Sequence, residues 1–525
     1  MERGCDARSW HLPPTAHEGE DFGPGSCDGY RMQLTRSRPL AATRRAIVGA
    51  AVLSCARSVA AQEAAPARPD DAARTADPAP GASSPESAPD YNADPGSPGV
   101  GKFLWSALDV AAVNLVLWGV PYAAGSPFVQ IDPSQWQNNF RVGPQWDDGE
   151  FEINQFAHPY QGGLYFSAAR VNGLSFWEAA PYTLLGSCMW EFFLETEQPS
   201  VSDLWTTTWG GSFIGETLYR LSNAILDDST SGSGRFFREF AALAVNPMNG
   251  LDRIVSGQAW ADGPAGKKFP LRFDFRLGVD GLGLSEGKGW GKTVRARIRF
   301  DYGDLYAQPE LNTPFEAFHF AVQLGASKSI FGQAIDGTGV LLGHRFGANA
   351  EHANLLAWVL TFEYSTNGTR KLRTRDSSGV YQLGEIGTGP GWFARWSLGS
   401  GFSLHSELDA LAVPSGAVTS PYAKYEANRS YDYGLGGALK LELSLRHERF
   451  GRLYAQANQH LYYVADGARG TEYIGTVELG AYANLAGGHG LGLGAVHYDR
   501  SSHYDEYPNL KDRFWSGRVH YEVEF

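Results

Sequence analysis

The sequence predicts an α+β membrane protein: an N-terminal helical domain followed by an antiparallel outer-membrane β-barrel of roughly 12 strands. Two observations carry this prediction. The apolar pattern has a helical period up to about residue 262 and a period of two after Pro270. The chain also ends on an alternating segment whose last residue is the aromatic Phe525. A soluble sandwich alternates too, but its strands are usually only about five to six residues long.

Composition excludes several other classes. Charged residues make up 19% and aromatic residues 13% of the 525 residues, which excludes a mostly disordered chain and a coiled coil. The mean hydropathy of -0.29 argues against a multi-helix inner-membrane protein. The formal net charge of -13 argues against nucleic acid as a partner, because a protein that neutralises phosphates needs a basic face.

The N-terminal region predicts an exported protein. Residues 1–61 are interpreted as a mis-called start followed by a signal peptide, because several arginines precede the short apolar run 46–53 and the cleavage pattern Val59-Ala60-Ala61. A basic amphipathic tail and a lipoprotein signal at Cys55 are the alternatives. Residues 62–101 are rich in Ala, Pro and acidic residues, which predicts a disordered, solvated linker.

Residues 102–262 are predicted to form a helical domain rich in aromatic residues. Its most apolar stretch, 103–120, is interrupted by two polar residues and is expected to stop at Pro121, so it barely reaches the roughly 20 residues of a membrane-spanning helix. Gly211 and Gly215 predict close helix packing, because small residues at this spacing let two backbones approach. Further helices are expected over residues 160–172, 176–195, 201–226 and 234–245.

Residues 270–525 are predicted to form the transmembrane barrel. Apolar and polar residues alternate, for example over 439–445, as in strands with lipid on one side and water on the other. Tyr521, Val523 and Phe525 alternate with polar residues and resemble the terminal signal read by the barrel-assembly machinery. We therefore expect outer-membrane lipid and this machinery as partners, and a location in the outer membrane with the helical domain on the periplasmic side.

Four segments of the helical domain carry a family resemblance. They read HPYQGGLYFSAARVNGLSFWE, GSCMWEFFLE, PSVSDL and GGSFIGETLYRLS, and they span residues 158–178, 186–195, 199–204 and 210–222. Together they resemble the bacterial family of uncharacterised envelope proteins known as domain of unknown function 3943. The resemblance implies an envelope protein of Gram-negative type. It implies no established activity, so any mechanism has to come from the residues themselves.

The polar residues of these segments allow two interpretations. In the structural one, the glutamates pair with arginines inside a helical cluster, because buried charges need partners. In the functional one, a histidine and carboxylates ligate a metal or form an acid/base pair. No HExxH or GxSxG signature supports the second, so we favour the first. The expected structural network is Asn154, Arg170, Glu216 and Arg220, with Glu191 and Glu195 also paired to the arginines. The catalytic candidates are His158, Glu191, Glu195 and Asp203.

The sequence therefore predicts a non-enzymatic outer-membrane protein without metal or cofactor, which handles a lipid or other amphiphile at its periplasmic side. Its ligand is not specified by the sequence. The alternatives are an outer-membrane hydrolase with a His/carboxylate centre in the helical domain, and a small transport channel. A barrel of about 12 strands favours a largely filled lumen, because wide aqueous channels need about 16–18 strands.

Overall fold

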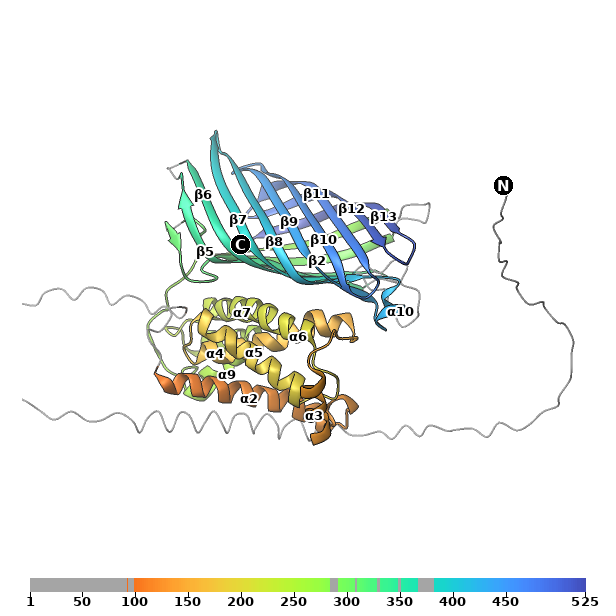
Figure 1. The fold of residues 1–525 in the computed structure, drawn as a ribbon. Helices are drawn as coiled ribbons and strands as arrows, with labels where there is room; N and C mark the ends of the chain where they lie inside the picture. Colours follow the sequence, from red (N-terminus) through yellow and green to blue (C-terminus); the bar gives the residue numbers. More distant parts are fainter. Residues whose placement is uncertain are drawn as a thin grey trace, which may run out of the picture.

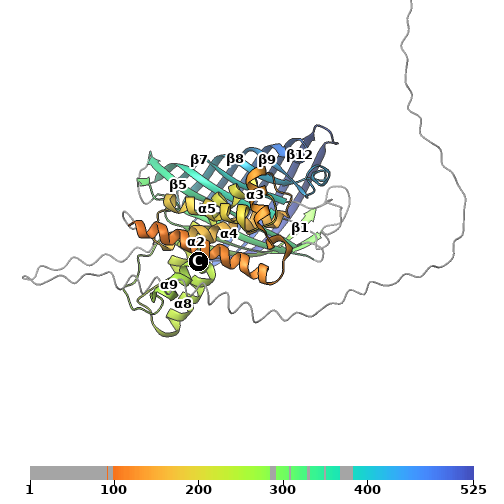
Figure 2. The ribbon, with the colours of Figure 1, turned by 60° about the horizontal axis from the view of Figure 1, so that its bottom comes forward.

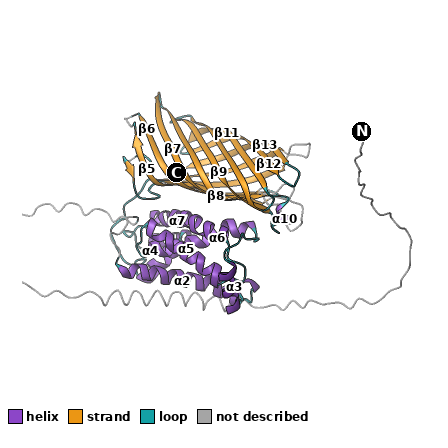
Figure 3. Ribbon diagram, viewed as in Figure 1, coloured by secondary structure: helices purple, strands orange, loops and turns teal. Residues whose placement is uncertain are grey.

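The computed structural model describes Asn92 and residues 99–283, 291–306, 309–327, 331–347, 351–366 and 382–525. The predicted mis-called start and signal peptide lie outside these residues, as does nearly all of the predicted linker. Figure 1 shows two bodies, a bundle of helices and a barrel of strands, and Figure 3 shows that helices and strands are almost completely segregated between them.

The helical body contains eight α-helices within the described residues. Two π-helical turns, Ile153–Ala157 and Thr206–Gly210, lead directly into the helices that follow them, so that one helical run extends from Val201 to Ile225. The helices are α2 (Val100–Ala123), α3 (Pro133–Val142), α4 (His158–Val171), α5 (Phe176–Phe193), α6 (Val201–Trp205), α7 (Gly211–Ile225), α8 (Gly232–Val245) and α9 (Pro247–Ser256).

Local sequence explains where several helices begin and end. Ser175 and Glu178 form a capping box at the start of α5, in which each side chain binds the other residue's backbone N–H. Asp132 caps α3, and Gly257 ends α9 in the left-handed conformation that glycine adopts most easily. Pro121 does not stop α2 as expected. The helix continues to Ala123, because a proline blocks hydrogen bonding to the turn before it and leaves the next residues free to stay helical.

In the described part of the chain, one helix, α2, is long and apolar enough to cross a membrane by length and composition. Only 17% of its most apolar window is buried within the protein.

The second body is a closed antiparallel barrel. Each of its strands pairs with its neighbours in sequence, and β1 pairs with β13 to close the sheet, which confirms the predicted fold class and the expected number of strands. The two-residue strand β3 (Glu310–Leu311) adds only an edge pairing to β5. The twelve barrel strands within the described residues are β1 (Leu271–Gly283), β2 (Gly291–Tyr302), β4 (Phe318–Ala326), β5 (Phe331–Phe346), β6 (His352–Thr366), β7 (Gln382–Gly399), β8 (Phe402–Thr419), β9 (Tyr431–His447), β10 (Gly451–Asp466), β11 (Gly470–Ala486), β12 (His489–Tyr504) and β13 (Leu510–Glu524).

The two ends of the barrel differ in their connections. We call the end where β1 begins and β13 finishes the terminal end, and the opposite one the far end. At the terminal end, very short turns join β7 to β8, β9 to β10, and β11 to β12. At the far end, the connection between β8 and β9 is longer and holds the short helix α10 (Ala423–Glu426). The terminal end also carries the long connection 303–317 between β2 and β4, and the far end has the short turn 467–469 between β10 and β11. Short turns are typical of the periplasmic side of outer-membrane barrels, and three of the four shortest lie at the terminal end, so we expect this end to face the periplasm.

The helical body packs against the outer wall of the barrel. On β6, Glu363 points into the barrel and pairs with Lys440, so Phe362 and Tyr364 point outward. Both are nevertheless only 1% exposed because helices cover them, whereas Trp358 on the same face of β6 is 46% exposed. The helices therefore occupy part of the surface that the alternating pattern assigns to the outside of the barrel.

This contact extends along the wall from one end of the barrel to the other. Tyr302 and Phe318, at the terminal end, share one apolar core with the helices, and so do Tyr431 and Tyr433 at the far end. Figures 1 and 2 both show the bundle lying along the side of the barrel, with α2 running lengthwise on its outer edge.

Charged side chains fill much of the lumen. Arg299 on β2 donates to Glu442 on β9 at 3.1 Å, and these two strands are six positions apart in the closed sheet, on opposite walls. Lys440 reaches Glu363 at 2.7 Å and Glu385 at 2.9 Å. Toward the terminal end, a cavity of about 400 Å³ remains beside Arg299. These ion pairs join opposite walls and narrow the lumen, as expected for a barrel of this strand number.

Candidate functional site

The buried charges of the helical body form two separate clusters. In the first, Glu216 of α7 lies between Arg170 of α4 and Arg220 of α7, with Oε2 2.8 Å from Arg170 Nε and Oε1 2.7 Å from Arg220 Nε. Each arginine also donates to a backbone carbonyl, Arg170 to Leu174 at 2.5 Å and Arg220 to Pro314 at 2.8 Å. Both carboxylate oxygens of Glu216 are paired, so this cluster requires no ligand.

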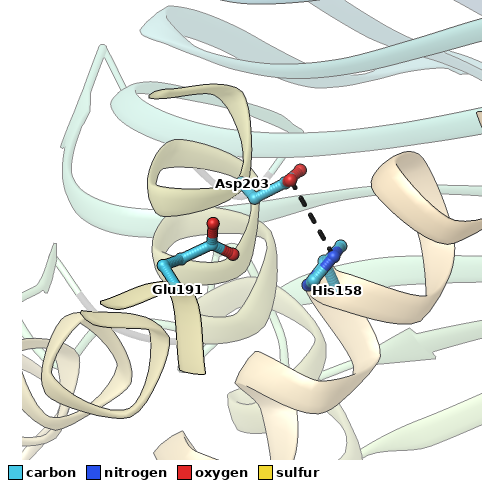
Figure 4. A group of neighbouring side chains, drawn as sticks. All are labelled: His158, Glu191 and Asp203. Atoms are coloured by element: carbon cyan, nitrogen blue, oxygen red, sulfur yellow. Dashed lines mark ion pairs between the residues drawn. The ribbon is translucent and has the colours of Figure 1, made fainter. Parts of the chain in front are cut away.

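The second cluster gathers His158, Glu191 and Asp203 (Figure 4). His158 opens α4, Glu191 lies in the last turn of α5, and Asp203 lies in α6. One nitrogen or oxygen atom of each side chain lies within 4.8 Å of those of the other two. His158 Nε2 is 3.8 Å from Asp203 Oδ2, a distance too long for a hydrogen bond and short enough for both atoms to face a common ligand.

Local helix geometry brings the three side chains together. The π-helical turn Ile153–Ala157 directly precedes His158, and turns of this kind are common at functional sites. Ser200 caps α6, because its Oγ accepts a hydrogen bond from the Asp203 N–H at 3.0 Å. The N–H of Ser200 itself donates to Glu191 Oε2 at 2.8 Å. Ser200 therefore holds the Glu191 carboxylate beside the Asp203 carboxylate.

Among the described residues, two oxygens of this cluster are buried and accept no hydrogen bond: Oε1 of Glu191 and Oδ1 of Asp203. The neighbouring Glu191 and Glu195 carboxyl groups share a hydrogen bond when one of them is protonated. The residues are 1% and 3% exposed, and His158 is 8% exposed. A buried polar atom without a partner costs about 1–3 kcal/mol, and more when the group is charged. Among the described residues, one ion-pair contact reaches these two carboxylates, from His158 to Asp203. The cluster is therefore short of positive charge.

This geometry differs from the structural interpretation of the sequence. Arg170 and Arg220 pair with Glu216 and not with Glu191 or Glu195. The reason lies in the direction of the helices. Both arginines lie toward the C-terminal ends of α4 and α7, whereas the remaining carboxylates lie where α5 ends and α6 begins, at the opposite end of the bundle.

Glu195 and Asp147 add two more carboxyl groups beside this cluster. Glu195 follows the end of α5 and accepts a hydrogen bond from Trp190 Nε1 at 2.8 Å. Burial, reinforced by repulsion from Asp203, raises the pKa of the Glu195 carboxyl to about 8. Asp147 lies before the π-helical turn and accepts a hydrogen bond from Asn154.

Sequence reasoning missed Asp147 and assigned Asn154 to the arginine network. The structure places Asn154 at the far end, where its amide also donates to the hydroxyl of Tyr431 at 2.8 Å. In the sequence, Asp147 stands out only as part of an Asp-Asp-Gly segment eleven residues before His158. Such a segment is common in loops and indicates no chemistry by itself.

The structure also reveals a second His/carboxylate group that the sequence did not indicate, inside the barrel. One side-chain nitrogen or oxygen atom of each of Glu363, Glu385 and His460 lies within 4.8 Å of those of the other two. Lys440 already pairs with both glutamates, and His460 Nδ1 lies 2.9 Å from Glu385. This group contains its own cation and does not require a metal.

The glycines singled out from the sequence lie where α4 and α7 touch. A Cβ atom on Gly211 would lie 2.5 Å from the carbonyl carbon of Gly162, and one on Gly215 would lie 2.8 Å from the Cβ of Phe166. Neither distance is compatible with a side chain, so the two helices meet through backbone atoms.

The carboxy-terminal residues close the barrel. Phe525 stacks on Phe273 of β1 with ring centroids 4.6 Å apart, and its N–H donates to the Phe273 carbonyl at 2.9 Å. Tyr521 and Val523 lie on β13 and pair with Leu277 and Phe275 of β1. Their role as an assembly signal stays a prediction.

The fold and the site together define a class: a closed barrel of the outer-membrane type, carrying on its outer wall a helical domain with a buried His/carboxylate cluster. The family model described as Domain of unknown function (DUF3943) matches residues 143–248. This match confirms the resemblance seen in the sequence. The matched region includes both charge clusters of the helical body, from Asp147 to Arg220.

Solved structures similar to this chain are barrels. The beta domain of the Bordetella autotransporter BrkA is 10% identical, with 49% of this chain and 99% of that chain covered and a TM-score of 0.24. The KdgM porin is 9% identical over 48% and 99% of the two chains, with a TM-score of 0.21. The translocator domain of the autotransporter NalP from Neisseria meningitidis is 15% identical over 48% and 88%, with a TM-score of 0.20. No curated protein matches the sequence.

Proposed function

We propose that this protein is a non-enzymatic outer-membrane protein, in which the barrel is a closed membrane anchor and the helical domain binds one divalent cation at His158, Glu191 and Asp203. The observation that carries the proposal is a pair of buried carboxylate oxygens, on Glu191 and Asp203, that accept no hydrogen bond from a described residue. One ligand atom of each of these two carboxylates and of His158 lies within 4.8 Å of the other two. A cation at the centre of the three side chains would satisfy both oxygens and neutralise the repulsion among the carboxyl groups.

The donor set selects the kind of metal. One imidazole nitrogen and two carboxylate oxygens suit Zn²⁺, Mn²⁺ or Fe²⁺, whereas Ca²⁺ and Mg²⁺ prefer oxygen ligands alone. The cap at Ser200 holds Glu191 through Oε2 and leaves Oε1 available to a ligand. In such sites a second partner of this kind fixes the orientation of the ligating group.

Burial favours a structural centre over the hydrolase alternative. His158 is the most exposed of the three residues at 8%, so a substrate could reach the cluster only after helices had moved. The narrowed lumen argues in the same way against the channel alternative, because Arg299 and Glu442 pair across its full diameter.

The test is metal binding by the full-length protein in detergent, after the resident metal has been removed with a chelator. Calorimetric titration with Zn²⁺ or Mn²⁺ should show one ion per chain. Glu191→Gln and Asp203→Asn should each weaken binding at least tenfold, which corresponds to about 1.4 kcal/mol.

The matched control is His460→Gln, which alters the other His/carboxylate group. It should leave binding unchanged, because Lys440 already supplies the positive charge there. Absence of stoichiometric binding in the wild type, or equal weakening by His460→Gln, would contradict the proposal.

A further inference from the structure

We propose that the helical domain is embedded in the same bilayer as the barrel, with α2 and α5 facing the lipid acyl chains. The inference rests on the proposed outer-membrane location of the barrel. It replaces the periplasmic position expected from the sequence with one beside the barrel wall, in the plane of the membrane.

The first argument is the extent of the contact between helices and barrel. The shared apolar core runs from Tyr302 and Phe318 at the terminal end to Tyr431 and Tyr433 at the far end. A domain confined to the periplasm could touch only the terminal end of a membrane-spanning barrel. A domain that covers the whole height of the wall must share the bilayer with it (Figures 1 and 2).

The second argument is the polarity of α2, which is opposite to that of a helix on a water-soluble protein. Its exposed side chains are apolar, and Leu104 and Leu115 are 60% and 56% exposed. Its buried side chains include Ser106 and Asn114, both at 0%. A surface helix in water turns its polar side outward, whereas a helix in lipid turns it toward its neighbours.

The same inversion is present in α5. Trp177, Leu184 and Phe193 are exposed, whereas Ser187 and Glu191 are buried. The two helices therefore present one continuous apolar surface, which we call the α2/α5 face. Large contiguous apolar surfaces are rare on soluble monomers.

Polar groups beneath the α2/α5 face are paired within the bundle. The amide of Asn114 donates to the Gly186 carbonyl at 3.1 Å, and the hydroxyl of Tyr165 bonds to its side-chain oxygen. Asn172 donates to Asp109 at 2.7 Å, which satisfies the one acidic residue of α2. Internal pairing of this kind is what a hydrocarbon environment demands, because no water is present to complete it.

Helix lengths match a bilayer. α2 has 24 residues and α5 has 18, which correspond to roughly 36 Å and 27 Å at about 1.5 Å per residue. The hydrocarbon core of a bilayer is about 30 Å thick. The continuous run from Val201 to Ile225 is as long as α2 and lies between the α2/α5 face and the barrel.

At the terminal end, α8 and α9 have the character of helices that lie at the membrane surface. Phe236, Phe237 and Phe240 are all exposed on α8. Its Arg235 instead turns inward, donating to Glu239 at 2.7 Å. An exposed aromatic cluster beside charged residues is typical of the interface between headgroups and acyl chains.

Lipid is the occupant that the structure favours, because the α2/α5 face and the uncovered wall of the barrel are both apolar and lie along the same length of the molecule. Outward residues of β6 that the helices leave uncovered, such as Trp358, are exposed and apolar like those of α2 and α5.

The test places single spin labels on the full-length protein after its four native cysteines have been replaced by serine. Leu115→Cys and Leu184→Cys probe the middle of α2 and α5. Leu356→Cys on the uncovered wall of β6 is the lipid control, and Tyr425→Cys in α10 at the far end is the water control. In lipid vesicles, the accessibility of each label to oxygen and to a water-soluble nickel chelate is measured.

Labels at Leu115 and Leu184 should behave like the one at Leu356, with high oxygen and low nickel accessibility. High nickel accessibility at these two positions, with Leu356 still in lipid, would overturn this inference while leaving the outer-membrane barrel intact. Low accessibility to both reagents would show that protein covers the face and would also overturn it. Nickel accessibility at Leu356 itself would instead refute the membrane location on which the inference rests.

Discussion

Replacing Glu216 with glutamine should destabilise the helical domain strongly, whereas the same change at Glu191 should not. Glu216 is 0% exposed and accepts from Arg170 at 2.8 Å and from Arg220 at 2.7 Å. Glu216→Gln removes the charge that neutralises both cations and turns an amide N–H₂ toward a guanidinium. Removing one partner of a buried pair costs about 3–5 kcal/mol, because the other charge is left buried and unpaired.

Glu191 is the matched comparison because it is about equally buried, lies in the same domain, and forms no ion pair with an arginine among the described residues. In the absence of metal, Glu191→Gln removes a carboxyl group that Glu195 and Asp203 repel. We expect a change within about 1 kcal/mol, or a gain, in the free energy of unfolding. The two variants should therefore differ by about 3 kcal/mol, roughly a hundredfold or more in the unfolding equilibrium.

The assay is urea unfolding of the detergent-solubilised protein, followed by tryptophan fluorescence in the presence of a chelator. The chelator matters because a bound metal would add its own stabilisation to the wild type and not to Glu191→Gln. Equal losses for the two variants would refute the division of the buried charge into a paired cluster and an unpaired one.

Three further predictions follow from the packing and the termini. Gly211→Ala should lower the stability by about 1–3 kcal/mol, because its Cβ would meet the Gly162 backbone. The control Gly119→Ala, on the open face of α2, should be neutral or stabilising, and thermal melts compare the two variants directly. Ser175→Ala should cost about 0.5–2 kcal/mol through loss of the capping box, measured in the same melts, and unchanged stability would show that the cap contributes nothing. Deleting Phe525 should reduce the amount of heat-modifiable barrel in outer-membrane fractions without changing synthesis, and recovery of the wild-type chain as a soluble periplasmic protein would contradict the proposed location.

The sequence was sufficient to predict the barrel because the physics of a strand is local. Side chains alternate in and out at every residue, so a period of two identifies both the strand and its two faces. The helices were predicted for a similar reason, since the period of apolar residues along a helix is also a local property. The structure adds that Ser175 and Glu178 mark the start of α5 by bonds within four residues.

The partners of the buried charges were not predictable in the same way. The buried charges lie on helices that pack together: Arg170, Glu191, Glu216 and Arg220. Their spacing along each helix does not show which charges on neighbouring helices lie side by side. The structure shows that Glu216 takes both arginines because α4 and α7 run side by side through the Gly162–Gly211 contact. The surplus of acid around His158 follows from that pairing and becomes visible only in three dimensions.

The position of the helical domain illustrates the same limit at a larger scale. On β6, Phe362 and Trp358 lie on one face and follow the same alternating pattern, yet helices bury the first and leave the second exposed. An aromatic side chain suits a lipid contact and a protein contact equally well. The alternating pattern therefore cannot show which part of the barrel wall faces lipid and which part the helices cover. On α2 the side chains are more informative. A buried Asn114 among exposed leucines is expected for a helix in lipid and is not expected for a surface helix in water. The polarity of the bundle, read together with the wall that it covers, therefore determines its environment more firmly than the hydropathy of any single segment.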